Sequence, residues 1–214
     1  MGDSAGISAI LFDADGVVQR AHPDWRARLG SCVAPEAAET FIEEVFEAEL
    51  PVLTGGDFGQ ALQRVLDRWQ VDRPVEEVLS VWDLIIIDQR MITAIQRLRR
   101  GGIRCYLATN QQNHRLDVMR SLPWYADGLD DQFYSCELGA AKPSRAFFTE
   151  IMHRIHTPAE QVLFLDDNKI NVEAARATGI NAELFPKDAG VRALAPLLSR
   201  YRPASGVGAG VGVA

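Results

Sequence analysis

The chain has 214 residues, 47% of them hydrophobic and 24% charged, with a formal net charge of −7, which fits a globular protein with one sizeable core plus an insertion. Its longest apolar runs are far shorter than the roughly 20 residues of a membrane span, so we expect no membrane partner and a cytoplasmic location. The negative charge disfavours nucleic acids as partners, so we expect a small ligand, whose phosphate, if it has one, is held by a local site.

The first predicted element is the short apolar run in "SAILFDAD", which ends in two aspartates, Asp13 and Asp15. A continuous apolar run of this length, bounded by turn-forming residues, is typical of a buried strand. Gly16 follows directly, and a glycine permits the tight turn that such a position requires. The pattern therefore predicts a buried strand whose carboxyl end presents two carboxylates.

The next segment, residues 17–88, contains no convincing strand pattern but several helical ones. Helices are predicted over about 25–30, 35–50, 58–69 and 75–81, with "PVLTGGD" as the clearest break. We expect an all-helical cap, inserted between the first strand and the rest of the sheet, with Trp25, Trp69 and Trp82 in its own core. Arg20 and His22 follow the first strand closely and are the candidates for substrate specificity.

Strand and helix patterns alternate in the second half of the chain. Strands are predicted in "IRCYLATN", "QVLFLDD" and "NAELFP", and helices over 91–100, 144–156, about 170–177 and, bent at Pro196, "VRALAPLLSRY". This alternation predicts an α/β fold with a doubly wound parallel sheet, a Rossmann-like core with helices on both faces. We expect the core to comprise residues 1–16 and 89–203 and the cap to comprise residues 17–88. Residues 204–214, rich in Gly and Ala, should form a flexible tail.

Polar residues cluster where the predicted strands end: Asp13, Asp15, Thr109, Asn110, Asp166 and Asp167. Ligands of open α/β sheets bind outside the carboxyl ends of the strands, so these residues should converge in one crevice. Several carboxylates in one place raise each other's pKa unless a cation lies among them. Oxygen ligands of this kind suit a hard divalent ion, and Mg²⁺ is the predicted cofactor.

Four motifs in this order resemble those of the haloacid dehalogenase superfamily, in its phosphatase-like hydrolase branch with a small helical cap after the first motif. They are "DADG" at 13–16, "TN" at 109–110, "KP" at 142–143 and "DDNKIN" at 166–171. The resemblance covers roughly residues 7–186. It implies a magnesium-dependent phosphatase that acts on a small phosphorylated metabolite through an aspartyl-phosphate intermediate, or a phosphotransferase with the same intermediate.

The resemblance also implies a role for each motif residue. Asp13 would be the nucleophile, and Asp15 the general acid and then the general base. Lys142 would offset negative charge during catalysis. The phosphate-binding residues would be Gly16, Thr109, Asn110 and Lys142. The metal ligands would be Asp13, Asp167 and the backbone carbonyl of Asp15. Asp166 and Asn171 would orient Lys142 and the water molecules bound to the metal.

Two other classes of function stay open. A 2-haloacid dehalogenase uses the same nucleophilic aspartate against carbon, but dehalogenases of this superfamily lack an acid at the position of Asp15 and use no metal. A non-catalytic binding protein on the same fold would be favoured by loss of a motif residue, and none is lost. One departure from the family pattern is mild, since Val17 stands where many relatives have Thr. Neither the physiological substrate nor the oligomeric state follows from the sequence.

Overall fold

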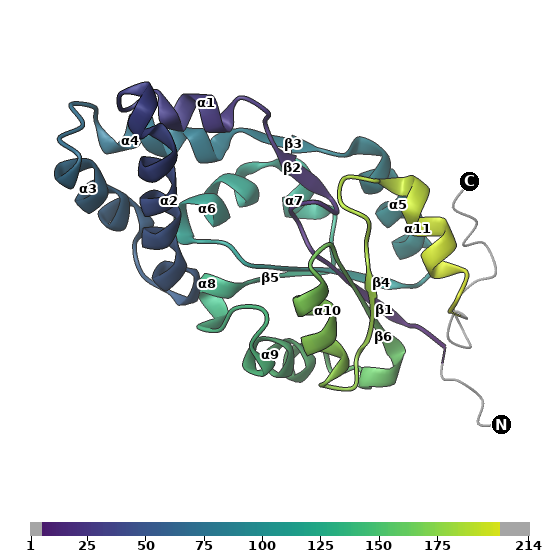
Figure 1. Ribbon diagram of the computed structural model, residues 1–214. Helices are drawn as coiled ribbons and strands as arrows, with labels where there is room; N and C mark the ends of the chain where they lie inside the picture. Colours follow the sequence, from purple (N-terminus) through teal and green to yellow (C-terminus); the bar gives the residue numbers. More distant parts are fainter. Residues whose placement is uncertain (1–5, 202–214) are drawn as a thin grey trace.

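The computed structural model of the chain describes residues 6–201, so the predicted tail at 204–214 lies outside the described residues. Its main sheet has five parallel strands in the order β5-β4-β1-β6-β7, which confirms the predicted Rossmann-like α/β core (Figure 1). Both β4 and β6 pair with β1, which therefore lies in the middle of the sheet. The strands are β1 (Ala9–Phe12), β4 (Arg104–Thr109), β5 (Asp131–Tyr134), β6 (Val162–Asp166) and β7 (Asn181–Leu184).

Helices cover both faces of this sheet (Figure 1). Ile10 and Phe12 of β1 pack into one core, with helices α5 (Gln89–Arg100) and α11 (Val191–Leu198). Ala9 and Leu11 pack into the other core, with helices α9 (Arg145–Ile155) and α10 (Lys169–Arg176). All four strand residues are fully buried, and burial on both faces explains why the sequence of β1 is a continuous apolar run.

The segment between β4 and α9 holds elements that the sequence analysis did not predict. They are helices α6 (Asn113–Ser121), α7 (Pro123–Asp127) and α8 (Ser135–Leu138), together with the edge strand β5. Only Phe133 and Tyr134 of β5 are buried. The strand therefore shows neither the continuous nor the alternating apolar pattern by which strands are recognised.

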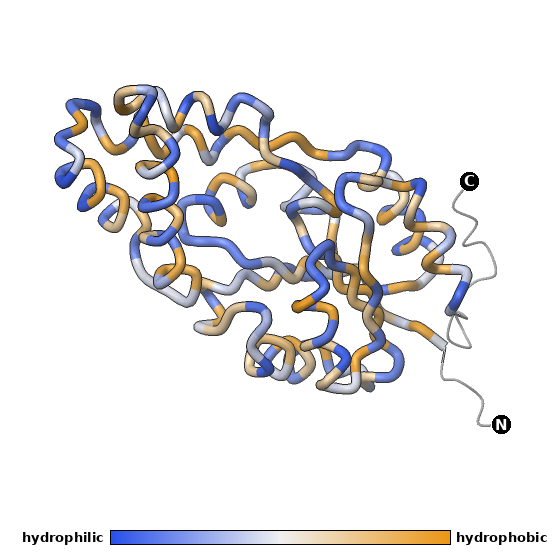
Figure 2. The backbone as a smooth tube through the Cα atoms, in the orientation of Figure 1, coloured by the Kyte–Doolittle hydropathy of each residue, from blue (hydrophilic) through white to orange (hydrophobic). Residues whose placement is uncertain are grey.

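The insertion forms a separate group of helices, which lies at the left of Figure 1. In Figure 2 these helices alternate between hydrophobic and hydrophilic positions, as helices with one buried side do. Trp82 is buried in the core of this group, and Trp25 and Trp69 pack against it, as predicted. The helices are α1 (Trp25–Gly30), α2 (Ala38–Glu49), α3 (Phe58–Arg68) and α4 (Val75–Leu79), with 3-10 turns η1 (Pro35–Ala37), η2 (Leu50–Thr54) and η3 (Ser80–Asp83); a further turn, η4 (Ala159–Gln161), precedes β6.

The prediction that residues 17–88 contain no strand is wrong at both ends of the segment. Strands β2 (Gln19–Ala21) and β3 (Ile85–Ile87) pair antiparallel, with Gln19 opposite Ile87. The cap is therefore not all-helical, because this two-stranded stem joins it to the core. Strands of three residues are too short to show a period, and the two partners stand at opposite ends of the insertion. In the described part of the chain, no helix has the length and apolar character that crossing a membrane requires.

Candidate active site

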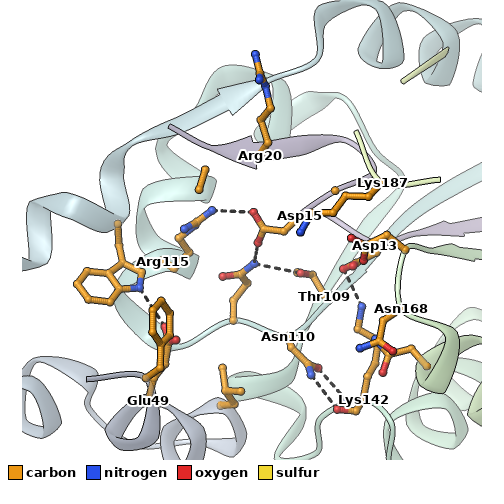
Figure 3. Close-up of a pocket in the computed structure, with 18 of the residues that line it drawn as sticks. Asp13, Asp15, Arg20, Glu49, Thr109, Asn110, Arg115, Lys142, Asn168 and Lys187 are labelled. Atoms are coloured by element: carbon orange, nitrogen blue, oxygen red, sulfur yellow. Dashed lines mark hydrogen bonds and ion pairs between the residues drawn. The ribbon is translucent and has the colours of Figure 1, made fainter. Parts of the chain in front are cut away.

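The carboxyl ends of β1, β4 and β6 bring the predicted motif residues together in one cavity (Figure 3). Asp13 follows β1 directly, and its backbone N–H donates to the carbonyl of Leu165 in β6 at 2.9 Å. Thr109 and Asp166 are the last residues of β4 and β6. The cavity has a volume of about 970 Å³, and the predicted residues that line it are Asp13, Asp15, Gly16, Thr109, Asn110, Lys142, Asp167 and Asn171. Other core residues that line it are Gln111, Arg115, Asn168, Lys169, Lys187 and Asp188.

A buried lysine joins two of the aspartates. Lys142 Nζ lies 2.7 Å from Asp13 Oδ1 and 2.7 Å from Asp166 Oδ2. Asp166 has no exposed side-chain surface, and it accepts further hydrogen bonds from the backbone N–H of Asn168 at 2.7 Å and from Asn171 Nδ2 at 3.1 Å. Buried charges are tolerated when they are paired and hydrogen-bonded in this way. Asp166 and Asn171 therefore hold the lysine against Asp13.

Asn110 lines the cavity, and its side chain is bonded to the backbone of Lys142. Its Nδ2 donates to the Lys142 carbonyl at 2.9 Å, and its Oδ1 accepts from the Lys142 N–H at 2.8 Å. Both ends of the amide are thus engaged. The side chain of Asn110 therefore positions the lysine loop, and its predicted role in phosphate binding stays a prediction. Thr109 lines the cavity, and its hydroxyl accepts a hydrogen bond from Gln111 Nε2 at 3.2 Å.

Three carboxylates form a cluster that fits a hard cation. Asp13, Asp166 and Asp167 each offer an oxygen, and these oxygens lie within 4.8 Å of one another. Burial raises the pKa of Asp13 to about 7, opposed by Lys142 and reinforced by Asp166. Burial, followed by the charge of Asp166, also raises the pKa of Asp167. Three neighbouring carboxylates repel one another when ionised, and a bound cation offsets this repulsion. Because all the donor atoms are oxygens, the cluster suits Mg²⁺. The side chain of Asp15 is not part of this cluster.

Gly16 brings the first loop into direct contact with Asp167. Its φ is +83°, and a Cβ at this position would lie 2.3 Å from Asp167 Oδ2. Both the left-handed backbone and the close approach require a glycine. The Gly16 carbonyl also accepts from the N–H of Asp188 at 2.9 Å, so the loop that carries the two aspartates is fixed from two sides.

Asp15 is held by three side chains that the sequence analysis missed. Its Oδ1 accepts from Arg115 Nη2 at 2.9 Å and from Gln19 Nε2 at 3.1 Å, and its Oδ2 accepts from Gln111 Nε2 at 2.8 Å. Figure 3 shows the carboxylate turned towards Arg115 and away from Lys142. Helical spacing gives no signal for this pair, because Gln111 precedes the N-cap of α6 (Asn113–Ser121) and only Arg115 lies in the helix.

The opposite wall of the cavity belongs to the cap and is mostly apolar. Glu49 is its one acid, and Oε1 of Glu49 accepts from Trp82 Nε1 at 3.1 Å. Burial raises the pKa of Glu49. The apolar residues of this wall are Ala21, Pro23, Trp25, Phe46, Leu53, Val81 and Trp82. Glu49 approaches the core only because the cap folds over it, and the sequence analysis did not find it.

The two predicted specificity residues lie at the margin of the site. Arg20 lines the cavity, but Figure 3 shows its guanidinium directed away from Asp13 and Asp15. His22 is not among the described residues that line the cavity. Its Nδ1 instead accepts from the backbone N–H of Asp24 at 3.2 Å. The structure therefore brings the core residues together and leaves His22 apart from them.

The fold and this site define an α/β protein with a Rossmann-like core, an inserted helical segment and an acidic site at the carboxyl ends of its strands. Residues 7–179 match the family of haloacid dehalogenase-like hydrolases. The chain belongs to this family, as the four motifs predicted.

Two curated fungal proteins share part of the sequence. Sesquiterpene phosphatase astK of Aspergillus oryzae is 31% identical over 93 residues, which cover 44% of this chain and 47% of that protein. Drimenol cyclase drtB of Aspergillus calidoustus is 34% identical over 106 residues, which cover 47% of this chain and 20% of that protein. The matched region thus spans less than half the length of these relatives.

Several solved structures share the fold. A HAD-like family hydrolase from Porphyromonas gingivalis has a TM-score of 0.75 at 22% identity and covers 92% of this chain and 98% of its own. A HAD family enzyme from Bacteroides thetaiotaomicron, in complex with magnesium and inorganic phosphate, has a TM-score of 0.72 at 18% identity, and the match covers 84% of this chain and 94% of that enzyme. A dehalogenase has a TM-score of 0.67 at 16% identity, and the match covers 92% of this chain and 98% of the dehalogenase. Because dehalogenases share the fold, the fold alone does not decide the reaction.

Proposed function

We propose that the protein is a magnesium-dependent phosphatase that hydrolyses a small phosphomonoester through an aspartyl-phosphate on Asp13. The observation that carries the proposal is the setting of the Asp13 carboxylate. Its Oδ1 is held by Lys142 Nζ at 2.7 Å and by the Ala14 N–H at 2.8 Å, whereas no described residue donates a hydrogen bond to Oδ2. One oxygen is thus fixed, and the other is available as a nucleophile at the cavity.

Two likenesses support a phosphatase. One relative carries the name sesquiterpene phosphatase, and one protein of the same fold binds magnesium and inorganic phosphate. Here, Asp13, Asp167 and the backbone carbonyl of Asp15 would hold Mg²⁺. When bound, the ion supplies positive charge that lets an anionic nucleophile approach a phosphate.

The residues of the chain can then perform both half-reactions. Asp13 Oδ2 attacks phosphorus, the bond from phosphorus to the alcohol oxygen breaks, and Asp15 donates a proton to that oxygen. In the second step water attacks the phosphorus of the aspartyl-phosphate while Asp15 accepts a proton from the water. Inorganic phosphate leaves and the Asp13 carboxylate is restored. Lys142, fixed beside Oδ1, stabilises negative charge without having to move.

Attack of Asp13 on the carbon of a haloacid is the second candidate reaction. It would leave Asp15 and the cluster with Asp167 without a task, since that reaction needs neither a proton for an alcohol oxygen nor a metal. Transfer of the phosphoryl group to an acceptor other than water would use the same first step, so phosphotransfer is a variant of this proposal.

Phosphate release from 4-nitrophenyl phosphate tests the proposal. We expect turnover with Mg²⁺, loss of turnover in excess chelator and recovery when the ion is added back. Halide release from 2-chloropropionate should stay at background. Full turnover in chelator, or release of halide, would contradict the proposal.

A further inference from the structure

The cavity has two chemically different sides, and the cap side is built for apolar contact. Trp25 and Phe46 both line it, and their rings meet edge to face with centroids 5.5 Å apart. Phe46 is nevertheless 38% exposed. Leu53, Val81 and Trp82 extend the apolar surface along the same wall. A large apolar surface left open beside a reaction centre is typical of a binding site for an apolar group.

The same wall carries little positive charge. Among the described lining residues, the cap contributes one cation, Arg20, which Figure 3 shows directed away from the catalytic carboxylates. The other cations that line the cavity lie on the core side with Lys142: Arg115, bonded to Asp15 at 2.9 Å, Lys169, 3.6 Å from Glu173, and Lys187, which Figure 3 shows near Asp13. Glu49 adds a carboxyl group and no counter-charge for an anion. A second phosphate or a carboxylate placed against Trp25 and Phe46 would thus lose its hydration with only Arg20 of the cap as a possible partner.

The size of the cavity calls for a bulky group. Its volume of about 970 Å³ lies at the upper end of the range of roughly 300–1,000 Å³ that is common for sites of drug-sized ligands. A phosphoryl group and a metal ion occupy a small part of such a volume. The remaining space lies between the catalytic loops and the apolar wall, where the alcohol part of the ester must go.

We propose that the substrate is a phosphomonoester of a bulky, uncharged and largely apolar alcohol, with its hydrocarbon part against Trp25 and Phe46. This inference rests on the proposed phosphatase function and specifies its substrate class. The core holds the phosphate and performs the chemistry, and the cap wall selects the leaving alcohol by the apolar area that it buries. Arg20 and His22 then have a smaller share in specificity than the aromatic pair.

A series of n-alkyl phosphates from butyl to decyl measures the effect of the length of the apolar chain alone, because the reactivity of the leaving alkoxide is nearly the same throughout. We expect kcat/KM with Mg²⁺ to rise roughly twofold to fourfold per methylene, as expected from the free energy of burying one CH₂ group. An ω-carboxyalkyl phosphate of the same length as decyl phosphate should be at least tenfold poorer than decyl phosphate.

Variants of the wall connect the series to named residues. Phe46→Ala and Trp25→Ala should flatten the dependence on chain length, whereas Leu184→Ala should not. Leu184 is a matched control because it is 46% exposed, lies on β7 and does not line the cavity. Phe46→Lys should lower activity on decyl phosphate and raise it on the ω-carboxyalkyl phosphate, since it adds a positive charge to the apolar wall.

The outcomes separate this inference from the function on which it rests. Turnover of 4-nitrophenyl phosphate together with a flat alkyl series, or with equal use of the carboxylated ester, would overturn the substrate class alone. No turnover of any ester, including 4-nitrophenyl phosphate, would overturn both. A chain-length dependence that survives in Phe46→Ala and Trp25→Ala would show that the hydrocarbon binds elsewhere.

Discussion

The core side and the cap side of the cavity are held in place by different forces. On the core side, Lys142 lies between Asp13 and Asp166 in a buried ion pair that is almost closed to solvent. On the cap side, aromatic rings such as Trp25 and Phe46 face the cavity from a group of helices with its own hydrophobic core. Ion pairs and hydrogen bonds fix atoms within a fraction of an ångström, as chemistry requires, whereas apolar surfaces tolerate variation in shape. In the proposed function, the core side is therefore the fixed reaction centre, and the cap side is an adaptable wall that selects the substrate.

The largest expected effect comes from the nucleophile on the core side. Asp13→Asn removes the anionic oxygen at nearly constant shape, so we expect turnover to fall by roughly 10⁴-fold or more. Rapid quench followed by intact-mass measurement should find no phosphoprotein. Asp117→Asn is a suitable control, because this aspartate is exposed on α6 and does not line the cavity. A phosphorylated Asp13→Asn protein would mean that another residue is the nucleophile.

The second effect tests whether the core side is held by buried charge. Lys142→Met leaves Asp13 and Asp166 buried without their counter-charge, and breaking such a pair costs about 3–5 kcal/mol of unfolding free energy. Urea unfolding in the absence of metal should measure this loss. The double variant with Asp166→Asn should recover part of it. Lys169→Met is the control: Lys169 is exposed and lies 3.6 Å from Glu173, so its loss should change stability by less than about 0.5 kcal/mol. Equal stability of the two lysine variants would exclude the ion pair as a structural support.

The third effect separates Asp15 from Asp13. With an aryl leaving group little proton donation is needed, so Asp15→Asn should still be phosphorylated on Asp13. Hydrolysis of the intermediate should slow by roughly a hundredfold or more, within the usual range for general acid–base catalysis. The phosphoprotein should then accumulate, with a burst of 4-nitrophenol. Normal steady-state turnover of Asp15→Asn would show that Asp15 is not the general acid and base.

The parts of the fold that could be predicted from the sequence are those whose signal is local. β1 and β6 are buried along their whole length, so their apolar runs identify them. β5 could not be found in this way, because its first residue is exposed at the edge of the sheet. The strands β2 and β3 gain their structure from each other across the whole insertion, and a pairing between distant segments leaves no local pattern.

The same distinction applies to the site. Asp13 and Asp166 stand at the ends of predicted strands, so their convergence followed from topology, whereas Lys142 was assigned only through the family resemblance. Glu49 reaches the cavity because of the way the cap packs on the core, which no spacing within α2 reveals. The sequence analysis also gave Asn110 a phosphate contact, and only the structure shows its amide committed to the Lys142 backbone.

The smallest expected effect tests whether the cap side can change without disturbing the core side. Trp82→Phe keeps an aromatic ring beside Phe58 but removes the N–H that Glu49 accepts at 3.1 Å. Without this donor we expect the Glu49 carboxyl to turn towards the cavity and its water, so that an alkyl chain must desolvate it on binding at a cost of about 1 kcal/mol, roughly fivefold in affinity. We expect KM for decyl phosphate to rise by about that factor. Trp69→Phe, which alters the cap core against Phe41 away from the cavity, should leave KM unchanged. In the proposed site inorganic phosphate would contact only the core side, so its inhibition constant should be the same in both variants and in the unmodified protein. If that constant shifts together with KM in Trp82→Phe, the two sides of the cavity are mechanically coupled, and the division between a fixed reaction centre and an independent selecting wall does not hold.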